Sequence, residues 1–117
     1  MTVSDLAGRP CEACRAGAPQ VTQQQLDELM AQLPEWRIIE VDGVKRLTRT
    51  FSCENFLDAM AFAECISEVA EQEHHHPSLL VEWGKLTVTW WTHKIKGLHE
   101  NDFILAARTD LLSFSKK

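Results

Sequence analysis

The chain has 117 residues, a formal net charge of −5, 44% hydrophobic and 25% charged residues, a mixture that predicts one globular domain able to bury its own core. The acidic balance argues against direct binding of nucleic acid, which needs a basic surface. No apolar run approaches the roughly 18 residues of a membrane span, and residues 1–15 lack the apolar stretch of a secretory signal. We therefore expect a cytoplasmic protein with no membrane partner and with reduced thiols at its cysteines, Cys11, Cys14, Cys53 and Cys65.

The first elements in chain order are an irregular arm and a helix. Residues 1–20 contain two glycines and two prolines and show no apolar period, which predicts a flexible N-terminal arm ahead of a domain over residues 21–117. A helix is predicted over residues 21–36. Thr22 and Gln25 have the spacing of a capping box at its start, and Pro34 stops it. Its apolar residues recur at helical spacing, at Leu26, Leu29, Met30 and Leu33.

Two hairpins and two further helices follow. Asp42-Gly43 between two strand-like runs predicts a hairpin over residues 35–52. A long helix is expected next, capped by Ser52 or by Glu54-Asn55 and ending near His74 or His75 because Pro77 follows. The apolar residues expected on or near one face of this helix are Phe56, Met60, Ala63, Ile66 and Ala70. A second hairpin, turning at Gly84-Lys85, and a last helix capped by Asn101 complete the order.

The predicted order is α-β-β-α-β-β-α. Two hairpins separated by a long helix favour a four-stranded antiparallel sheet with helices packed on one face, an α+β sandwich. In the second strand of the later hairpin, alternate residues share a face. One face carries Leu86, Val88, Trp90 and Thr92, and the other carries Thr87, Thr89, Trp91 and His93.

The concentration of imidazoles is the feature most relevant to function. His74, His75 and His76 are adjacent, and His93 follows after the second hairpin. A metal site is one reading, but adjacent side chains diverge, and the zinc-like spacing of Cys11 and Cys14 has no matching second pair. A second reading is a solvated helix end, where polar side chains suit the helix dipole.

The third reading is acid–base catalysis. Glu71 precedes His75 by four residues, so its carboxylate would accept an imidazole N–H and fix the tautomer if the last helical turn persists. His93 can return to the same edge of the sheet, and two histidines across one pocket supply an acid and a base near neutral pH. Trp83, Trp90 and Trp91 bracket this region, either as core residues or as an aromatic wall for a flat heterocycle. No serine or cysteine lies in a recognisable nucleophile context.

Several of these residues form a longer pattern at fixed spacing. It consists of Glu71, His75, His76 and Pro77, then Thr92, His93, Gly97, Leu98 and Asp102. The pattern resembles the signature of the pterin-4a-carbinolamine dehydratases, also called 4a-hydroxytetrahydrobiopterin dehydratases. The resemblance covers roughly residues 20–115. It is strongest to bacterial members associated with phenylalanine hydroxylase, which often carry an arm similar to residues 11–15.

The resemblance implies a fold, a reaction and a set of residue roles. The family fold is an α+β sandwich with a four-stranded antiparallel sheet, and members form homodimers or homotetramers. The implied reaction removes water from 4a-hydroxytetrahydropterin to give quinonoid dihydropterin, so that the cofactor of an aromatic amino-acid hydroxylase is recycled, without a metal or a bound cofactor.

The resemblance also carries roles over to particular positions. His75 and His93 match the two essential histidines, one giving a proton to the departing hydroxyl and the other taking one from the pterin ring. His76 matches a histidine that helps to hold substrate, and Glu71 the acid that orients the first histidine. Trp91, Thr92 and Asp102 match positions that line or support the pocket, whereas His74 is given no role.

Two rival functions remain. Some relatives act as binding or assembly partners, and the retained histidine set favours catalysis over such a non-catalytic role. A metal-binding protein that uses the neighbouring histidines and the thiol pair is the other alternative.

Overall fold

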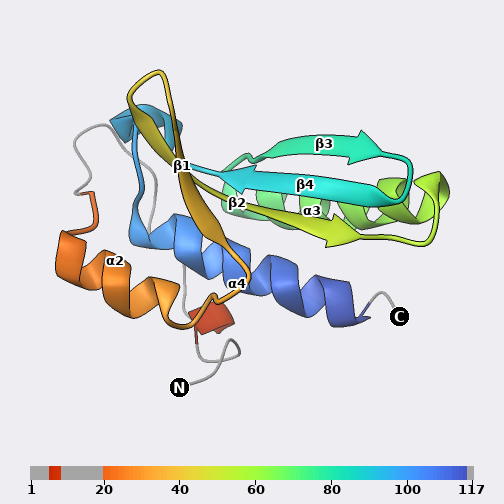
Figure 1. Ribbon diagram of the computed structural model, residues 1–117, viewed down its shortest axis with the longest axis horizontal. Helices are drawn as coiled ribbons and strands as arrows, with labels where there is room; N and C mark the ends of the chain where they lie inside the picture. The colour runs from red at the N-terminus through yellow and green to blue at the C-terminus, as the bar shows by residue number, and fades with distance from the viewer. Residues whose placement is uncertain (1–5, 9–19, 116–117) are drawn as a thin grey trace.

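A computed structural model describes residues 6–8 and 20–115 of the chain. The element order is α2 (Gln23–Met30), β1 (Arg37–Val41), β2 (Val44–Ser52), α3 (Phe56–Glu73), β3 (Ser78–Glu82), β4 (Lys85–Trp90), the short 3₁₀ helix η1 (His93–Ile95) and α4 (Glu100–Ser115). The four strands form one antiparallel sheet in the order β1-β2-β4-β3. The helices lie against one face of this sheet (Figure 1), so the predicted α+β sandwich is confirmed.

The start of α2 agrees with its predicted capping box. The Thr22 side chain accepts a hydrogen bond from the backbone N–H of Gln25, and the Gln25 side chain accepts one from the backbone N–H of Thr22. This reciprocal pair satisfies two of the N–H groups that the first turn leaves without a partner. The helix ends at Met30, before Pro34.

The two hairpin turns differ in how closely the sequence predicts them. Asp42 and Gly43 connect β1 to β2 with φ of 53° and 77°, the pair of positive values that a two-residue hairpin turn requires. The second turn lies one residue earlier than predicted, since Glu82 pairs with Lys85 and the turn residues are therefore Trp83 and Gly84. Gly84 has φ of 76° there, and the Trp83 side chain at this tip is exposed.

Helix α3 begins after Asn55, whose side chain accepts the Asp58 N–H, and it buries a narrow stripe along its length. The buried residues are Ala59, Phe62, Ala63, Ile66 and Ala70. Two of the residues predicted on or near this face, Phe56 and Met60, are instead about half exposed. Each residue advances a helix by about 100°, so Met60 lies roughly a quarter turn from Ala59 at the flank of the stripe.

Helix α4 begins at Glu100, so the expected cap at Asn101 is wrong and Asn101 lies inside the helix. His99 occupies the capping place instead. Its Nδ1 accepts the Asn101 N–H, and the Asp102 carboxylate accepts the His99 N–H, a reciprocal arrangement like a capping box. The start of α4 thereby holds the buried Asp102 in place.

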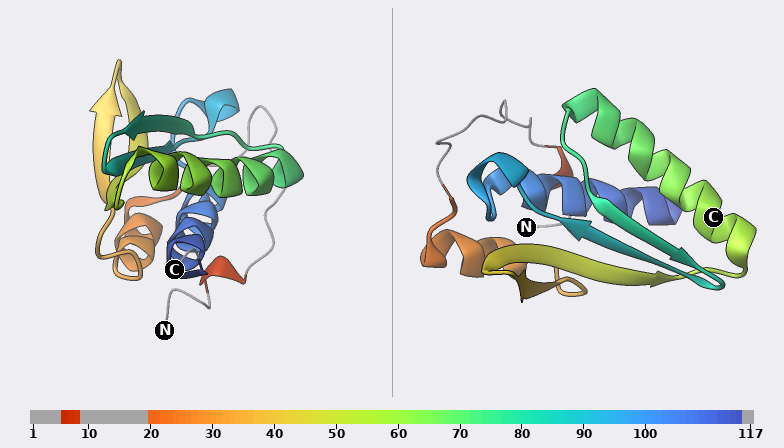
Figure 2. Two further views of the ribbon diagram at one scale, coloured as in Figure 1. Left: turned by 90° about the vertical axis from the view of Figure 1, so that its right-hand side faces the viewer. Right: turned by 90° about the horizontal axis from the view of Figure 1, so that it is seen from above.

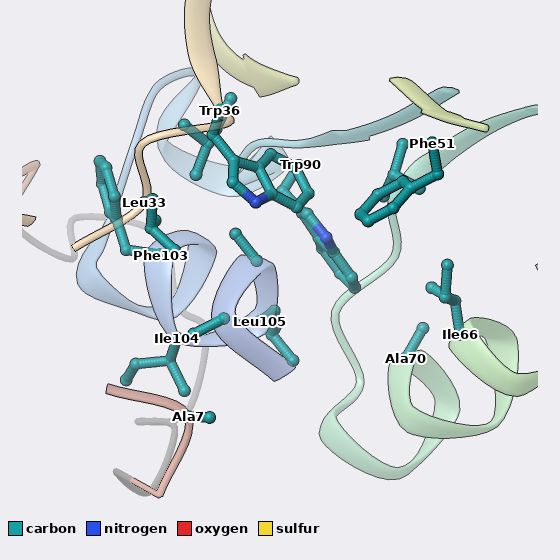
Figure 3. Close-up of a cluster of buried hydrophobic side chains, with 14 of the residues drawn as sticks. Ala7, Leu33, Trp36, Phe51, Ile66, Ala70, Trp90, Phe103, Ile104 and Leu105 are labelled. Carbon is teal, nitrogen blue, oxygen red and sulfur yellow. The ribbon is translucent and has the colours of Figure 1, made fainter. Parts of the chain in front are cut away.

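The core fills the space between the sheet and the helices α3 and α4 (Figure 3). Phe51 on β2 makes edge-to-face contacts with Trp36 and Phe62, at ring-centroid distances of 6.0 and 4.9 Å. The Trp36 indole N–H donates to Asp110, which also pairs with Arg49 at 2.8 Å. Burial raises the pKa of the Asp110 carboxyl above its ordinary value, against the opposing effects of Trp36 and Arg49.

A short N-terminal piece joins this core. Leu6 and Ala7 are buried, and the Ala7 carbonyl accepts a hydrogen bond from Arg108 on α4. The rest of the predicted arm, including Cys11 and Cys14, lies outside the described residues, while Cys53 and Cys65 are free thiols. Within residues 6–8 and 20–115 no helix has the length and apolar character needed to cross a membrane.

Candidate active site

The end of α3 separates the three adjacent histidines. His74 adopts the left-handed conformation, with φ of 53° and ψ of 41°, and the His75 N–H bonds back to the Ala70 carbonyl in the manner of a Schellman motif. A non-glycine residue in this region costs about 1–3 kcal/mol. The reversal sends the neighbouring side chains in different directions. His75 is buried, whereas His74 and His76 are exposed.

His75 is joined to a buried carboxylate on another helix. Its Nε2 lies 2.7 Å from Oδ1 of Asp102, and both side chains are almost completely buried. Oδ2 of Asp102 accepts the Thr92 hydroxyl at 2.7 Å and the His99 N–H at 2.9 Å. A buried carboxylate needs such donors. An ionised carboxylate accepts hydrogen bonds and donates none, so at this contact the N–H that donates belongs to Nε2 of His75.

The acid bonded to His75 is therefore not the one that the sequence predicts. Glu71 lies 2.7 Å from Nε2 of His76, and the acid bonded to His75 is Asp102, so the expected pairing of Glu71 with His75 is wrong. The left-handed turn at His74 breaks the helical spacing on which that pairing depended. The Glu71–His76 pair is exposed, and surface pairs of this kind contribute about 0–1 kcal/mol.

His93 reaches the same place from the other side of the sheet. A pair of backbone hydrogen bonds between Thr92 and Gly97 closes the loop after β4, and η1 begins at His93 inside this loop. Nε2 of His93 lies 3.3 Å from the His76 carbonyl oxygen. Figure 2 shows the C-terminal end of α3 and η1 away from the β3–β4 turn. The hydrogen bond between His75 and Asp102 joins residues 27 positions apart in the sequence.

These side chains surround one hollow of about 220 Å³. Its lining consists of His74, His75, His76, Thr92, His93 and Lys94. A larger hollow of about 530 Å³ lies against α2 and Glu100, but no histidine lines it. We place the candidate site in the smaller hollow because imidazoles and a buried His–Asp pair are the groups able to move protons near neutral pH. In the described part of the chain, no three His, Cys, Asp or Glu side chains are grouped so as to hold a metal ion.

Comparison with known proteins identifies the group to which this site belongs. The family model described as "Pterin 4 alpha carbinolamine dehydratase" matches residues 19–112. The chain belongs to this family. A relative from Marinobacter nauticus is 53% identical over 110 residues, and one from Saccharophagus degradans is 49% identical over 110 residues. The alignments cover 94% of this chain and 99% and 97% of the relatives, and both relatives bear the name "Putative pterin-4-alpha-carbinolamine dehydratase".

Two solved structures share the dehydratase-family fold. A "transcriptional coactivator/pterin dehydratase" from Brucella melitensis is 28% identical with a TM-score of 0.72, over 80% of this chain and 98% of that one. A pterin dehydratase-like protein described as a RuBisCO assembly factor in the alpha-carboxysome is 21% identical with a TM-score of 0.57. That likeness covers 68% of this chain and 89% of the other, and at this identity it supports the fold alone.

The structure brings most of the predicted site residues of this family member together. His75, His76, Thr92 and His93 line the hollow, and Asp102 lies beneath His75. Glu71 and Trp91 lie beside it, through His76 and His93 respectively. His74, to which the sequence assigned no role, also lines the hollow.

Two residues at or near the site, His99 and Lys94, were not predicted from the sequence. His99 holds the Asp102 carboxylate, and its place three residues before an acid was an available capping signal. Lys94 lines the hollow, and only its position next to His93 pointed to it.

Proposed function

We propose that this protein removes water from 4a-hydroxytetrahydropterin to give quinonoid dihydropterin, with His75, His93 and His76 as its catalytic groups. The observation that carries the proposal is the buried His75–Asp102 pair, which opens onto the same hollow as His76 and His93 in a chain of the dehydratase family. Proton transfer between histidines suits this reaction, because the substrate must lose a hydroxyl group and a ring proton together.

We assign His75 as the base and His93 as the acid. Asp102 keeps the His75 proton on Nε2, so Nδ1 accepts the proton that leaves the pterin ring nitrogen, and the carboxylate stabilises the imidazolium that forms. His93 gives a proton to the hydroxyl at C4a, the C–O bond breaks with its electrons on oxygen, and water leaves. One proton is taken and one is given, so the pair returns to its starting state when His75 passes its proton back through solvent to His93.

His76, Glu71, Trp91 and Thr92 support these two groups. His76 holds substrate at the rim of the hollow and is itself oriented by Glu71. Thr92 satisfies the second oxygen of Asp102, and Trp91 offers a ring against His93. General acid–base catalysis contributes about 10²- to 10⁴-fold, which is the acceleration that these residues have to supply.

The setting of the reaction follows from the same proposal. The substrate is the product left by an aromatic amino-acid hydroxylase, so we propose that the protein recycles the pterin cofactor of such an enzyme in the cytoplasm. No metal and no further cofactor take part, and the protein acts as a homodimer or homotetramer.

The test compares wild type with His93→Ala in a dehydration assay on 4a-hydroxytetrahydropterin made in place by a hydroxylase, followed by ultraviolet absorbance of the quinonoid product. We expect wild type to accelerate dehydration and His93→Ala to lose at least about tenfold of its turnover while remaining folded. No acceleration by wild type would refute the dehydratase and favour the binding or assembly role. Loss of activity after prolonged EDTA treatment, restored by zinc, would favour a metal site instead.

A further inference from the structure

The candidate acid His93 is held only weakly by hydrogen bonds. It is exposed and lies at the start of a three-residue 3₁₀ helix. Its hydrogen bond to the His76 carbonyl spans 3.3 Å, just beyond the usual range of 2.7–3.2 Å for N–H···O. A side chain that transfers a proton has to be held within about 0.5 Å of its productive position. Another contact must therefore fix this ring.

That contact is a stack on the outer face of the sheet. The rings of Trp91 and His93 lie 4.5 Å apart between centroids and are tilted by 31°. The guanidinium carbon of Arg46 lies 4.0 Å from the centroid of a Trp91 ring. Because Leu47 on β2 pairs with Trp90 on β4, the antiparallel register carries Arg46 opposite Trp91. The stack therefore runs from β2, across the end of β4, to η1.

Among the described residues, Arg46 contacts the Trp91 ring and forms no ion pair. Two other arginines of the described residues have carboxylate partners, Arg49 with Asp110 and Arg108 with Glu73. Among the described residues no carboxylate pairs with Arg46, and its Nε is buried without a hydrogen-bond partner. Burying a polar group in this way is unfavourable. The contact that offsets it is the cation–π interaction with Trp91.

We propose that Arg46 is a positioning residue for the dehydration: it fixes the Trp91 ring, and Trp91 in turn fixes the His93 ring that donates the proton. This proposal rests on the proposed function, because the orientation of His93 affects turnover only if His93 donates a proton in the dehydration. Arg46 acts through Trp91 and does not touch the reacting atoms. Its loss should therefore lower kcat and leave KM nearly unchanged.

The first test needs no substrate. The ring protons of His93 are assigned by nuclear magnetic resonance through their disappearance in His93→Ala. We expect Arg46→Met to move them toward the shifts of a free histidine, since the ring current of Trp91 no longer acts at a fixed position. The matched control is Arg37→Met on β1, which removes the same charge from an exposed arginine that stacks on no aromatic ring of the described residues. His93 resonances should stay in place in that control, and His75 resonances should stay in place in both variants.

The second test uses turnover. Arg46→Met should lower kcat by about three- to tenfold, the range equivalent to one cation–π contact. Arg46→Lys should recover part of the loss, because an ammonium group also attracts an indole face. In a His93→Ala background, Arg46→Met should cause no further loss, since the two substitutions remove the same effect.

Two results would overturn the proposal. One is an Arg46→Met protein with unmoved His93 resonances. The other is a raised KM together with a further loss of turnover in the His93→Ala background, which would mean that Arg46 contacts the substrate directly. If wild type has no dehydratase activity, the proposed function fails, and the resonance comparison alone decides whether Arg46 sets the His93 ring.

Discussion

Replacing Asp102 by asparagine tests how the buried carboxylate controls His75. The Asp102 side chain is completely buried and receives three hydrogen bonds, from His75, Thr92 and the His99 N–H. An asparagine of the same shape has only one acceptor oxygen. With that oxygen toward Thr92 and His99, the amide NH₂ faces Nε2 of His75. Nε2 must then accept a hydrogen bond, so the neutral imidazole moves its proton to Nδ1.

The magnitudes follow from this change of tautomer. Loss of a hydrogen bond to a charged group costs about 1.5–3 kcal/mol of unfolding free energy, so Asp102→Asn should remain folded but less stable. A protonated Nδ1 cannot take a proton from substrate. We therefore expect kcat to fall by at least about tenfold, with a ceiling of about 10⁴-fold set by the whole acid–base contribution.

Three measurements decide the outcome: dehydration kinetics, denaturant unfolding, and long-range ¹H–¹⁵N spectra that report which nitrogen of His75 carries the proton. Asp110→Asn is the matched control, because it removes a second buried carboxylate from α4 whose partners are Trp36 and Arg49, away from the hollow. It should lose stability but keep kcat. A folded Asp102→Asn protein with wild-type kcat, or with His75 still protonated at Nε2, would show that the reasoning is wrong.

Two further predictions concern the different roles of His75 and His74 in turnover and the effect of Asp110 on stability. His75→Ala should lower turnover by at least about tenfold. His74→Asn, which retains a residue tolerant of the left-handed conformation, should leave turnover close to wild type; equal activity in both variants would remove the assignment. The raised pKa of Asp110 means that the unfolded carboxyl ionises first as pH rises above 3.8, so its contribution to stability falls through the window up to the folded-state pKa. The unfolding free energy of wild type minus that of Asp110→Asn should therefore decrease as pH rises from the ordinary carboxyl pKa to the raised folded-state pKa, and a difference independent of pH would contradict this.

The elements that the sequence predicts well are those with a local physical cause. The Thr22–Gln25 capping box and the Asp42-Gly43 turn depend on residues within four positions of one another, and both are found as predicted. The errors occur where a contact distant in sequence decides the outcome. The cap of α4 is His99 and not Asn101, because Asp102 bonds back to His99 while also holding His75. The general preference for asparagine at helix starts does not predict these hydrogen bonds of Asp102.

In the candidate site, too, a contact distant in sequence decides which acid bonds to which histidine. Glu71 is four residues from His75, so helical spacing made it the expected partner, but the left-handed residue His74 ends the helical spacing before His75. The acid that bonds to His75 comes from a helix 27 residues away. The local acid then remains for His76, at the surface. Three adjacent histidines thus acquire different surroundings: His75 a buried carboxylate, His76 an exposed one, and His74 the turn that separates them. A division of roles among identical side chains is what an acid–base site requires, and here it arises from one backbone reversal followed by one long-range hydrogen bond.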